Sequence, residues 1–243
     1  MKKLVTIIVC EKYDGEDNSP SEEIEFLYTD EDRQSGFIIK NAVKQAKGKY
    51  VCLVDENFGH QETQGFINVL GSASADMIVF DGGCCFKTSI IKGLDLSDDC
   101  DRETAEIFAA LACKSVAKTA VKPFNVAKTA VTYSESVENN LLTAVTEFKK
   151  DKQKLEKGVY SAAFDLICNK LILYYASAIY AAYKKQLDRE QIKAFDAKLK
   201  ENIVLYLALE KRFTCAKLKA LRKNGFKITI FNAPKFKKLL NIK

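Results

Sequence analysis

The hydrophobic pattern in the first half of the chain alternates between short apolar runs and helical spacing. Residues 4–10 form a continuous apolar, β-branched run, typical of a strand buried on both faces of a parallel sheet. A second apolar segment follows at 24–29, and from Ser35 the apolar positions recur at helical spacing until Gly48. A strand is predicted at 50–54. This order, with short connections, predicts βαβ units in a parallel sheet.

The alternation continues along the chain after this unit. The further predicted elements are a helix at 61–70, a strand at 76–80, a turn at Gly82-Gly83, a strand or short helix at 86–91, an amphipathic helix at 101–118, and one or two strands within 121–133. The first half of the chain is therefore expected to form a single α/β domain, spanning residues 1–135.

The pattern changes to long helices in the second half, residues 136–243. Helices are predicted at 136–156, 159–185 and 188–222, followed by a strand-like segment at 226–231 and a short basic amphipathic stretch at 234–243. We therefore expect a C-terminal α-helical extension that ends in a basic tail.

Composition favours an ordinary folded protein, with 47% hydrophobic and 29% charged residues. No secretory leader opens the sequence, and the most apolar stretch, 171–183, is shorter than the roughly 20 residues that span a bilayer. This stretch is predicted to be a buried helix, and the protein is predicted to be cytoplasmic. The eight cysteines include no Cys-x-x-Cys pair, and the chain has one histidine, so reduced, buried thiols are expected rather than a zinc site.

Charge is unevenly distributed along the chain. Ten acidic residues lie between Glu11 and Asp32, whereas residues 211–243 contain eleven Lys or Arg and no acid. The tail is interpreted either as a solvated helix face or as a contact with the inner face of an anionic membrane, in which Phe236, Leu239, Leu240 and Ile242 would bury. No RNA-binding or helix-turn-helix pattern accompanies it, so no nucleic-acid partner is expected.

Two acidic clusters follow predicted strands. Asp30-Glu31-Asp32 ends the second strand, and Asp55-Glu56-Asn57 follows the strand at 50–54. Ligands of parallel sheets bind beyond the carboxyl ends of the strands, and an acid there can hold a divalent cation that neutralises a diphosphate. The competing interpretation is that these acids cap helices or lie in solvated turns.

Residues 42–55, Ala-Val-Lys-Gln-Ala-Lys-Gly-Lys-Tyr-Val-Cys-Leu-Val-Asp, are similar position by position to a segment of family 2 glycosyltransferases. In that family a helix ends at Ala-Lys-Gly, a Tyr-aliphatic strand follows, and an Asp-x-Asp motif closes the segment. Residues 5–9 resemble the family's first strand, and residues 25–31 resemble its second. The resemblance covers roughly residues 4–135.

The resemblance implies a GT-A-like (Rossmann-like) α/β fold with a mostly parallel sheet flanked by helices. It also implies a nucleotide diphosphate sugar as donor and Mg²⁺ or Mn²⁺ as cofactor. Asp30 matches the aspartate that contacts the nucleotide base, and Asp55 matches the first acid of the metal motif. Asn57 stands where the family has its second, metal-ligating Asp, and an amide is a poorer ligand for a hard dication than a carboxylate.

The family takes its catalytic base from a Glu-Asp pair at the start of a later helix. The matching segment here is Asp101-Arg102-Glu103-Thr104, in which Glu103 aligns with the first acid and Thr104 occupies the position of the base. Glu103 and Asp101 are therefore the candidate bases, and helix capping is the alternative role for both.

Three functions are compatible with these motifs to different degrees. The leading hypothesis is an inverting glycosyltransferase that moves a sugar onto a cell-envelope or capsule glycan. The alternative is a non-catalytic GT-A-like binding or scaffolding protein that has lost the metal motif, as Asn57 and Thr104 suggest. A nucleotidyltransferase is disfavoured because the segment after the first strand is acidic rather than Gly-rich and basic. Walker and Rossmann patterns are absent, which argues against an ATPase and a dehydrogenase.

Overall fold

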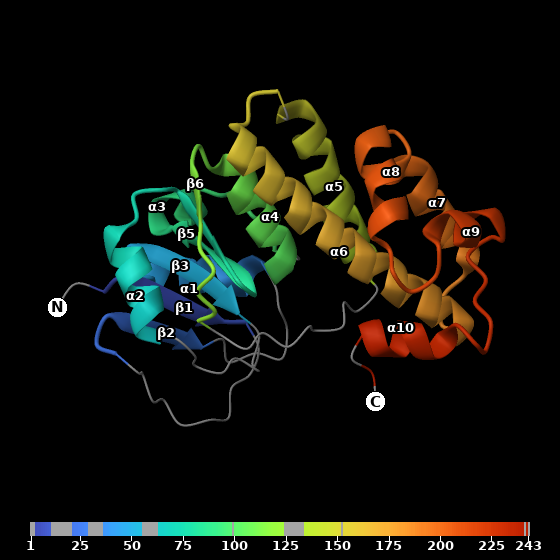
Figure 1. The fold of residues 1–243 in the computed structure, drawn as a ribbon, viewed down its shortest axis with the longest axis horizontal. Helices are drawn as coiled ribbons and strands as arrows, with labels where there is room; N and C mark the ends of the chain where they lie inside the picture. The colour runs from blue at the N-terminus through green and yellow to red at the C-terminus, as the bar shows by residue number, and fades with distance from the viewer. Residues whose placement is uncertain are drawn as a thin grey trace. The chain divides into compact units, whose positions relative to one another are not determined.

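The structure, a computed structural model, is drawn in Figure 1. It describes residues 3–10, 21–28, 36–54, 63–98, 100–123, 134–151, 153–240 and 242, without the side chains of 36–38 and 63. The chain divides into two compact units. Unit 1 comprises Met1–Ala127 and Asp151–Ala163, and unit 2 comprises Lys128–Lys150 and Phe164–Lys243.

Unit 1 contains, within its described residues, a six-stranded sheet of order β2-β1-β3-β5-β4-β6. The strands are β1 (Val5–Val9), β2 (Ile24–Tyr28), β3 (Tyr50–Val54), β4 (Met77–Phe80), β5 (Gly83–Lys87) and β6 (Val116–Lys118). Only β5 runs antiparallel to its neighbours in this sheet. The predicted mostly parallel α/β sheet flanked by helices is therefore confirmed, as is the C-terminal helical part.

Helices cover both faces of the sheet. They are α1 (Gly36–Gln45), α2 (Thr63–Ser72), α3 (Thr88–Lys92) and α4 (Arg102–Ala112). Phe66, Ile67 and Leu70 of α2 pack on one face, together with Cys52 and Cys85. Helix α4 approaches the other face, where Glu106 lies beside Cys84. Side chains alternate between the faces of a strand, so adjacent residues of β5 contact opposite helical layers.

Gly48, which precedes β3, is fixed against the start of β1. A Cβ atom at this position would lie 2.4 Å from the backbone nitrogen of Thr6, so only glycine fits without movement. The Gly48 nitrogen donates to Thr6 Oγ1 at 2.9 Å, and Thr6 Oγ1 donates to Glu25 Oε2 at 2.6 Å. This network joins β1, β2 and the turn before β3, and it explains physically why the Ala-Lys-Gly segment ends in glycine.

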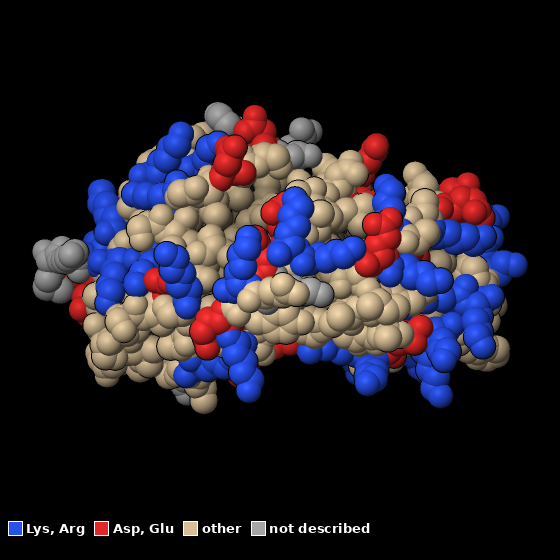
Figure 2. Space-filling view, turned by 90° about the horizontal axis from the view of Figure 1, so that it is seen from above, with Lys and Arg blue, Asp and Glu red and all other residues tan. Residues whose placement is uncertain are grey.

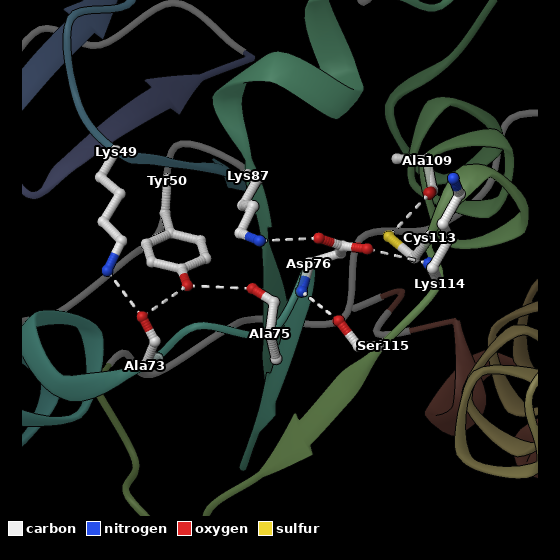
Figure 3. A network of polar contacts seen from close by, with 10 residues as sticks. All are labelled: Lys49, Tyr50, Ala73, Ala75, Asp76, Lys87, Ala109, Cys113, Lys114 and Ser115. Carbon is white, nitrogen blue, oxygen red and sulfur yellow. Dashed lines mark hydrogen bonds and ion pairs between the residues drawn. The ribbon is translucent and has the colours of Figure 1, made fainter.

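A second polar network lies at the same edge of the sheet, the amino edge, where β1, β3 and β4 begin (Figure 3). The Tyr50 hydroxyl donates to the carbonyl of Ala75 at 2.9 Å, and Lys87 Nζ lies 2.8 Å from Asp76 Oδ1. The backbone nitrogen of Asp76 donates to Ser115 Oγ. The hydrogen bond from Lys87 is the main cause that lowers the pKa of Asp76 from its ordinary value of 3.8.

Unit 2 is built from helices. The helices from α5 onward are α5 (Glu135–Asp151), α6 (Lys157–Tyr183), α7 (Arg189–Leu199), α8 (Ile203–Arg212), α9 (Leu218–Lys223) and α10 (Ala233–Leu239), and the first residues of α6 belong to unit 1. Among the described helices, α6 alone is long and apolar enough to cross a membrane by length and composition, and 61% of its most apolar window is buried. A core helix of a soluble protein has the same properties.

Arg222 of α9 holds several helices of unit 2 together. Its Nε lies 2.8 Å from Asp196 Oδ1 on α7, and its Nη1 lies 3.2 Å from Glu210 Oε1 on α8. The guanidinium stacks 3.5 Å from the centroid of the Tyr206 ring. The Tyr175 hydroxyl on α6 donates to Asp196 Oδ1 at 2.5 Å. The planar guanidinium of Arg222 thereby pairs with two carboxylates at once in the interior of this unit.

Three element predictions were wrong. The predicted helix at 188–222 is three helices, and the Asn202 side chain caps α8 where the first break occurs. The predicted helix at 101–118 ends at Ala112, because the residues after it extend to pair with β4 as β6. The predicted strand at 226–231 is irregular, since the chain makes a turn there and enters α10.

Two of the four apolar side chains of the basic tail are buried in unit 2. Phe236 is 0% exposed and Leu240 is 2% exposed, whereas Leu239 is half-buried and Ile242 is 38% exposed. The ring of Phe236 packs 6.1 Å from that of Phe213. Phe236 and Leu240 complete the core of this unit and are therefore not available to a bilayer, while contact of the tail with a membrane stays a prediction.

Candidate functional site

Three parallel strands of unit 1 end side by side. Val9, the last residue of β1, pairs with Tyr28, the last of β2, and with Val54, the last of β3. Neighbouring strands lie about 4.8 Å apart, so the three ends span roughly 10 Å along one edge. We call this edge of the sheet the carboxyl edge. Parallel sheets characteristically bind ligands there.

The candidate binding residues follow these strand ends directly in the sequence. Asp55 comes immediately after Val54, with Asn57 two residues further on, and Asp30 comes two residues after Tyr28. Asp30, Asp55 and Asn57 lie outside the described residues, so their side-chain positions remain predictions. The structure establishes the aligned strand ends from which both acidic segments continue.

Helix α4 runs from the carboxyl edge toward the amino edge. Near its start, Glu106 Oε1 lies 4.0 Å from the thiol of Cys84, the second residue of β5. The first residue of β5, Gly83, pairs with Phe80 at the end of β4. Beyond the other end of α4, the backbone nitrogen of Lys114 donates to Asp76 at the amino edge. The N-terminus of α4 is therefore directed toward the edge where β1, β2 and β3 end.

The first turn of α4 carries both candidate bases. Asp101 is the N-cap, and its Oδ1 accepts from the backbone nitrogen of Thr104 at 2.9 Å. Arg102 Nη2 lies 3.2 Å from Glu103 Oε1. Asp101 is 7% exposed, whereas the Glu103 side chain is 20% exposed, so Glu103 is the more accessible carboxylate.

Thr104 occupies the position that the resemblance gives to the base, and it is buried. Its side chain is 0% exposed, and within the described part of the chain its Oγ1 has no hydrogen-bond partner. A hydroxyl is also a much weaker base than a carboxylate at neutral pH. Thr104 is therefore unsuited to deprotonate an acceptor, which leaves Glu103 and Asp101 as the candidate bases.

Two charged residues of α4 were not singled out from the sequence. Arg102 Nη1 lies 3.3 Å from Glu106 Oε2, and their side chains are only 12% and 8% exposed. The spacing of four residues allows this pair on one helix face. An acid between Ala105 and Ile107, in an otherwise apolar stretch, was the available signal. Arg102 thus bridges Glu103 and Glu106 and fixes the charges near the helix start.

Two buried thiols on opposite faces of the sheet, Cys84 beside α4 and Cys52 on the face that α2 covers, are weakly reactive. Burial raises the pKa of Cys84 well above its ordinary value, and the nearby Glu106 carboxylate raises it further. A hydrogen bond with Cys85 and burial raise the pKa of Cys52 in the same way. Protonated thiols are poor nucleophiles and poor metal ligands. These thiols are therefore weak candidates for chemistry at this site, and the carboxylates remain the predicted reactive groups.

A metal site is not formed by the described residues alone. Among the residues that the structure describes, no group of three or more His, Cys, Asp or Glu side chains is arranged to hold a metal ion. The predicted ligand, Asp55, and its neighbour Asn57 lie outside them. Binding of Mg²⁺ or Mn²⁺ therefore stays a prediction from the resemblance.

Comparison with known proteins yields structural similarity without sequence similarity. No protein-family model and no curated protein matches the chain. A structure of S. aureus TarS 1–349 in complex with UDP-GlcNAc is 11% identical, with a TM-score of 0.48, over 98% of this chain and 90% of that one. A second structure of TarS 1–349 is 10% identical over the same shares, with a TM-score of 0.49. TM-scores below 0.5 at this identity assign no function to the chain.

Proposed function

We propose that this protein is a glycosyltransferase that moves a sugar from a nucleotide diphosphate sugar to a glycan of the cell envelope or capsule. One observation carries the proposal: β1, β2 and β3 end in register at the carboxyl edge. The acidic segments that follow β2 and β3 belong to the part of the sequence that resembles family 2 glycosyltransferases. A donor bound across this edge would meet both segments.

The donor-binding roles are assigned by the resemblance. Asp30 contacts the nucleotide base, and Asp55, assisted by Asn57, faces the diphosphate. Mg²⁺ or Mn²⁺ bound at Asp55 would neutralise the charge that develops on the leaving diphosphate. A carboxylate supplies the stronger oxygen ligand of the two, so Asp55 contributes more to metal binding than Asn57.

The acceptor side is assigned to the start of α4. In an inverting transfer, the acceptor hydroxyl oxygen forms a bond to the anomeric carbon while the bond from that carbon to the diphosphate oxygen breaks. The hydroxyl proton passes to a carboxylate, for which Glu103 is the proposed base and Asp101 the alternative. The direction of α4 toward the carboxyl edge supports this assignment.

Isothermal titration tests donor binding. The panel is UDP, GDP, CDP, TDP and UDP-GlcNAc, each with and without Mn²⁺. We expect one nucleotide to bind in a Mn²⁺-dependent manner, and we expect Asp55→Asn to weaken that binding at least about tenfold. Asp81 is the matched control, because it is an exposed acid that follows β4 at the same edge and lies outside the acidic segments. Absence of binding to every ligand would refute the proposal.

A second candidate function is a non-catalytic binding or scaffolding protein. The observation that favours it is the ion pair between Arg102 and Glu103, because it competes with an acceptor hydroxyl for the same carboxylate. Hydrolysis of the bound sugar nucleotide separates the two functions. A wild type as fast as Asn57→Asp supports the enzyme, whereas activity that appears only in Asn57→Asp supports a protein that has lost catalysis.

A further inference from the structure

A turn in unit 2 displays two large apolar side chains to solvent. The carbonyl of Thr229 accepts from the backbone nitrogens of Asn232 at 3.0 Å and Ala233 at 3.1 Å. Ile230 and Phe231 occupy the centre of this turn and are 76% and 89% exposed. They are the most exposed large hydrophobic residues in the described part of the chain. Turn centres normally carry Gly, Pro, Asn, Asp or Ser, so this composition needs an explanation.

The turn is anchored on both sides by buried aromatic residues. On the side that precedes it, Phe226 is 2% exposed and stacks on Tyr175 with ring centroids 6.0 Å apart. On the side that follows it, Phe236 is buried against Phe213. The apolar side chains on both sides of the turn are therefore buried in the core of unit 2. Ile230 and Phe231 are exposed to solvent, although buried aromatic side chains anchor the segments before and after them.

Lysines flank the turn without neighbouring acids in the sequence. Lys227, Lys235 and Lys238 are exposed, and residues 211–243 contain no acidic residue. Figure 2 shows one face of the molecule, on which Asp and Glu side chains are interspersed among Lys and Arg. The two arginines of the segment are already engaged, Arg212 with Asp165 and Arg222 with Asp196. The free cations of this segment are therefore ammonium groups.

We propose that the Thr229–Asn232 turn docks the protein onto an anionic lipid bilayer, with Ile230 and Phe231 in the interfacial region and the flanking lysines at the headgroups. An aliphatic and an aromatic side chain that protrude together match the apolar boundary of a bilayer. Lysines add attraction to anionic lipids. A nucleic-acid surface would more typically use arginine and several stacked aromatics. The proposal is independent of the transferase function.

A single tryptophan reports on insertion, because the chain contains none. Phe231→Trp is mixed with vesicles of phosphatidylcholine and phosphatidylglycerol in equal amounts, and with phosphatidylcholine alone. We expect a blue shift of its emission and quenching by brominated lipid on the anionic vesicles. Leu207→Trp is the matched control, since Leu207 is a 50% exposed apolar residue of α8. Its emission should not change.

Cosedimentation of the full chain with the anionic vesicles gives an independent measure. The double variant Ile230→Ser/Phe231→Ser should bind at least about tenfold more weakly than wild type, because the buried apolar area is lost. Both side chains are exposed, so thermal unfolding should be unchanged. Equal vesicle binding by wild type and the double variant, or no binding by wild type, would overturn the proposal. So would an emission shift of Phe231→Trp with single-stranded RNA but not with vesicles.

Discussion

The Glu106 carboxylate of α4 lies 4.0 Å from the thiol of Cys84 on β5, and its other oxygen lies 3.3 Å from the guanidinium of Arg102. This contact joins α4 to β5 near the carboxyl edge of the sheet. Arg102 also pairs with Glu103, the proposed base. The proposed base therefore shares its arginine partner with a second, buried carboxylate.

Replacement of Glu106 should destabilise the protein. Glu106→Ala leaves the buried Arg102 with one carboxylate fewer, and we expect a loss of about 2 kcal/mol in the free energy of unfolding. Glu147→Ala is the control, because Glu147 pairs with Lys150 at the surface and should cost less than about 0.5 kcal/mol. Urea titrations of both variants measure the difference. Equal losses would contradict a structural role for the buried pair.

Two glycines should respond in opposite ways to replacement by alanine. In Gly48→Ala the new Cβ meets the backbone of β1 at 2.4 Å, and we expect a loss of about 3 kcal/mol from the displacement it forces. Gly71 lies in α2, and in Gly71→Ala the nearest atom outside the helix backbone is Cδ1 of Leu4, which precedes β1, at 3.8 Å, an ordinary van der Waals contact. That variant should be neutral or up to about 1 kcal/mol more stable. Thermal unfolding of the two proteins provides the measurement.

The ion pair of Asp76 and Lys87 should make stability dependent on pH in acid. The pKa of Asp76 is lowered in the folded state, chiefly by its hydrogen bond from Lys87, so the stabilisation is complete above the unfolded-state pKa and lost as pH falls through the folded-state pKa. Asp76→Asn should therefore cost about 1 kcal/mol near pH 7, and the difference from wild type should shrink below about pH 4.

Urea unfolding from neutral to acid pH tests this dependence. Asp95→Asn is the control, since Asp95 is fully exposed and pairs with Lys40 at 3.4 Å, and its stability should follow wild type at every pH. A constant difference between Asp76→Asn and wild type down to the lowest pH would mean that ionisation of Asp76 is not the cause.

Arg222 should be intolerant of lysine. An ammonium group cannot reproduce the bonds from Nε to Asp196 and from Nη1 to Glu210, nor the stacking on Tyr206, so Arg222→Lys should lose about 2 kcal/mol or more. Arg212→Lys is the matched substitution at a half-exposed pair with Asp165, and it should lose less than about 1 kcal/mol. Chemical denaturation compares them. Similar losses in the free energy of unfolding for the two variants would show that burial of the Arg222 network adds nothing to its contribution to stability.

Much of unit 1 could be predicted from the sequence, because its strands are buried on both faces. The runs that became β1 and β3 are continuous and apolar, and the helical spacing before Gly48 leaves little choice for α1. The reversal of β5 was missed, because strand direction depends mainly on pairing with β3 and β4, although a local hairpin signal was present. A two-residue connection at Asp81-Gly82, with Gly82 at φ 102°, was the available hairpin signal.

Unit 2 was predicted less accurately for a different reason. The apolar spacing from 188 to 222 is nearly continuous, and the breaks arise from a capping side chain, Asn202, and from packing of Phe213. For the candidate site, the acids at the helix start were found from the resemblance. Their partner Arg102 and its second carboxylate, Glu106, were missed, although their spacing of four residues on α4 was visible in the sequence.

The polar networks of Thr6, Gly48 and Asp76 all lie at the amino edge, opposite the edge from which the candidate acidic segments continue. In unit 1 these stabilising networks and the proposed ligand-binding segments therefore belong to separate stretches of sequence. Changes in length or composition after β1, β2 or β3 could alter the ligand while these networks stay intact. Such a sheet is well suited to diversification, and libraries confined to residues 11–20, 29–35 and 55–62 should yield mostly folded variants.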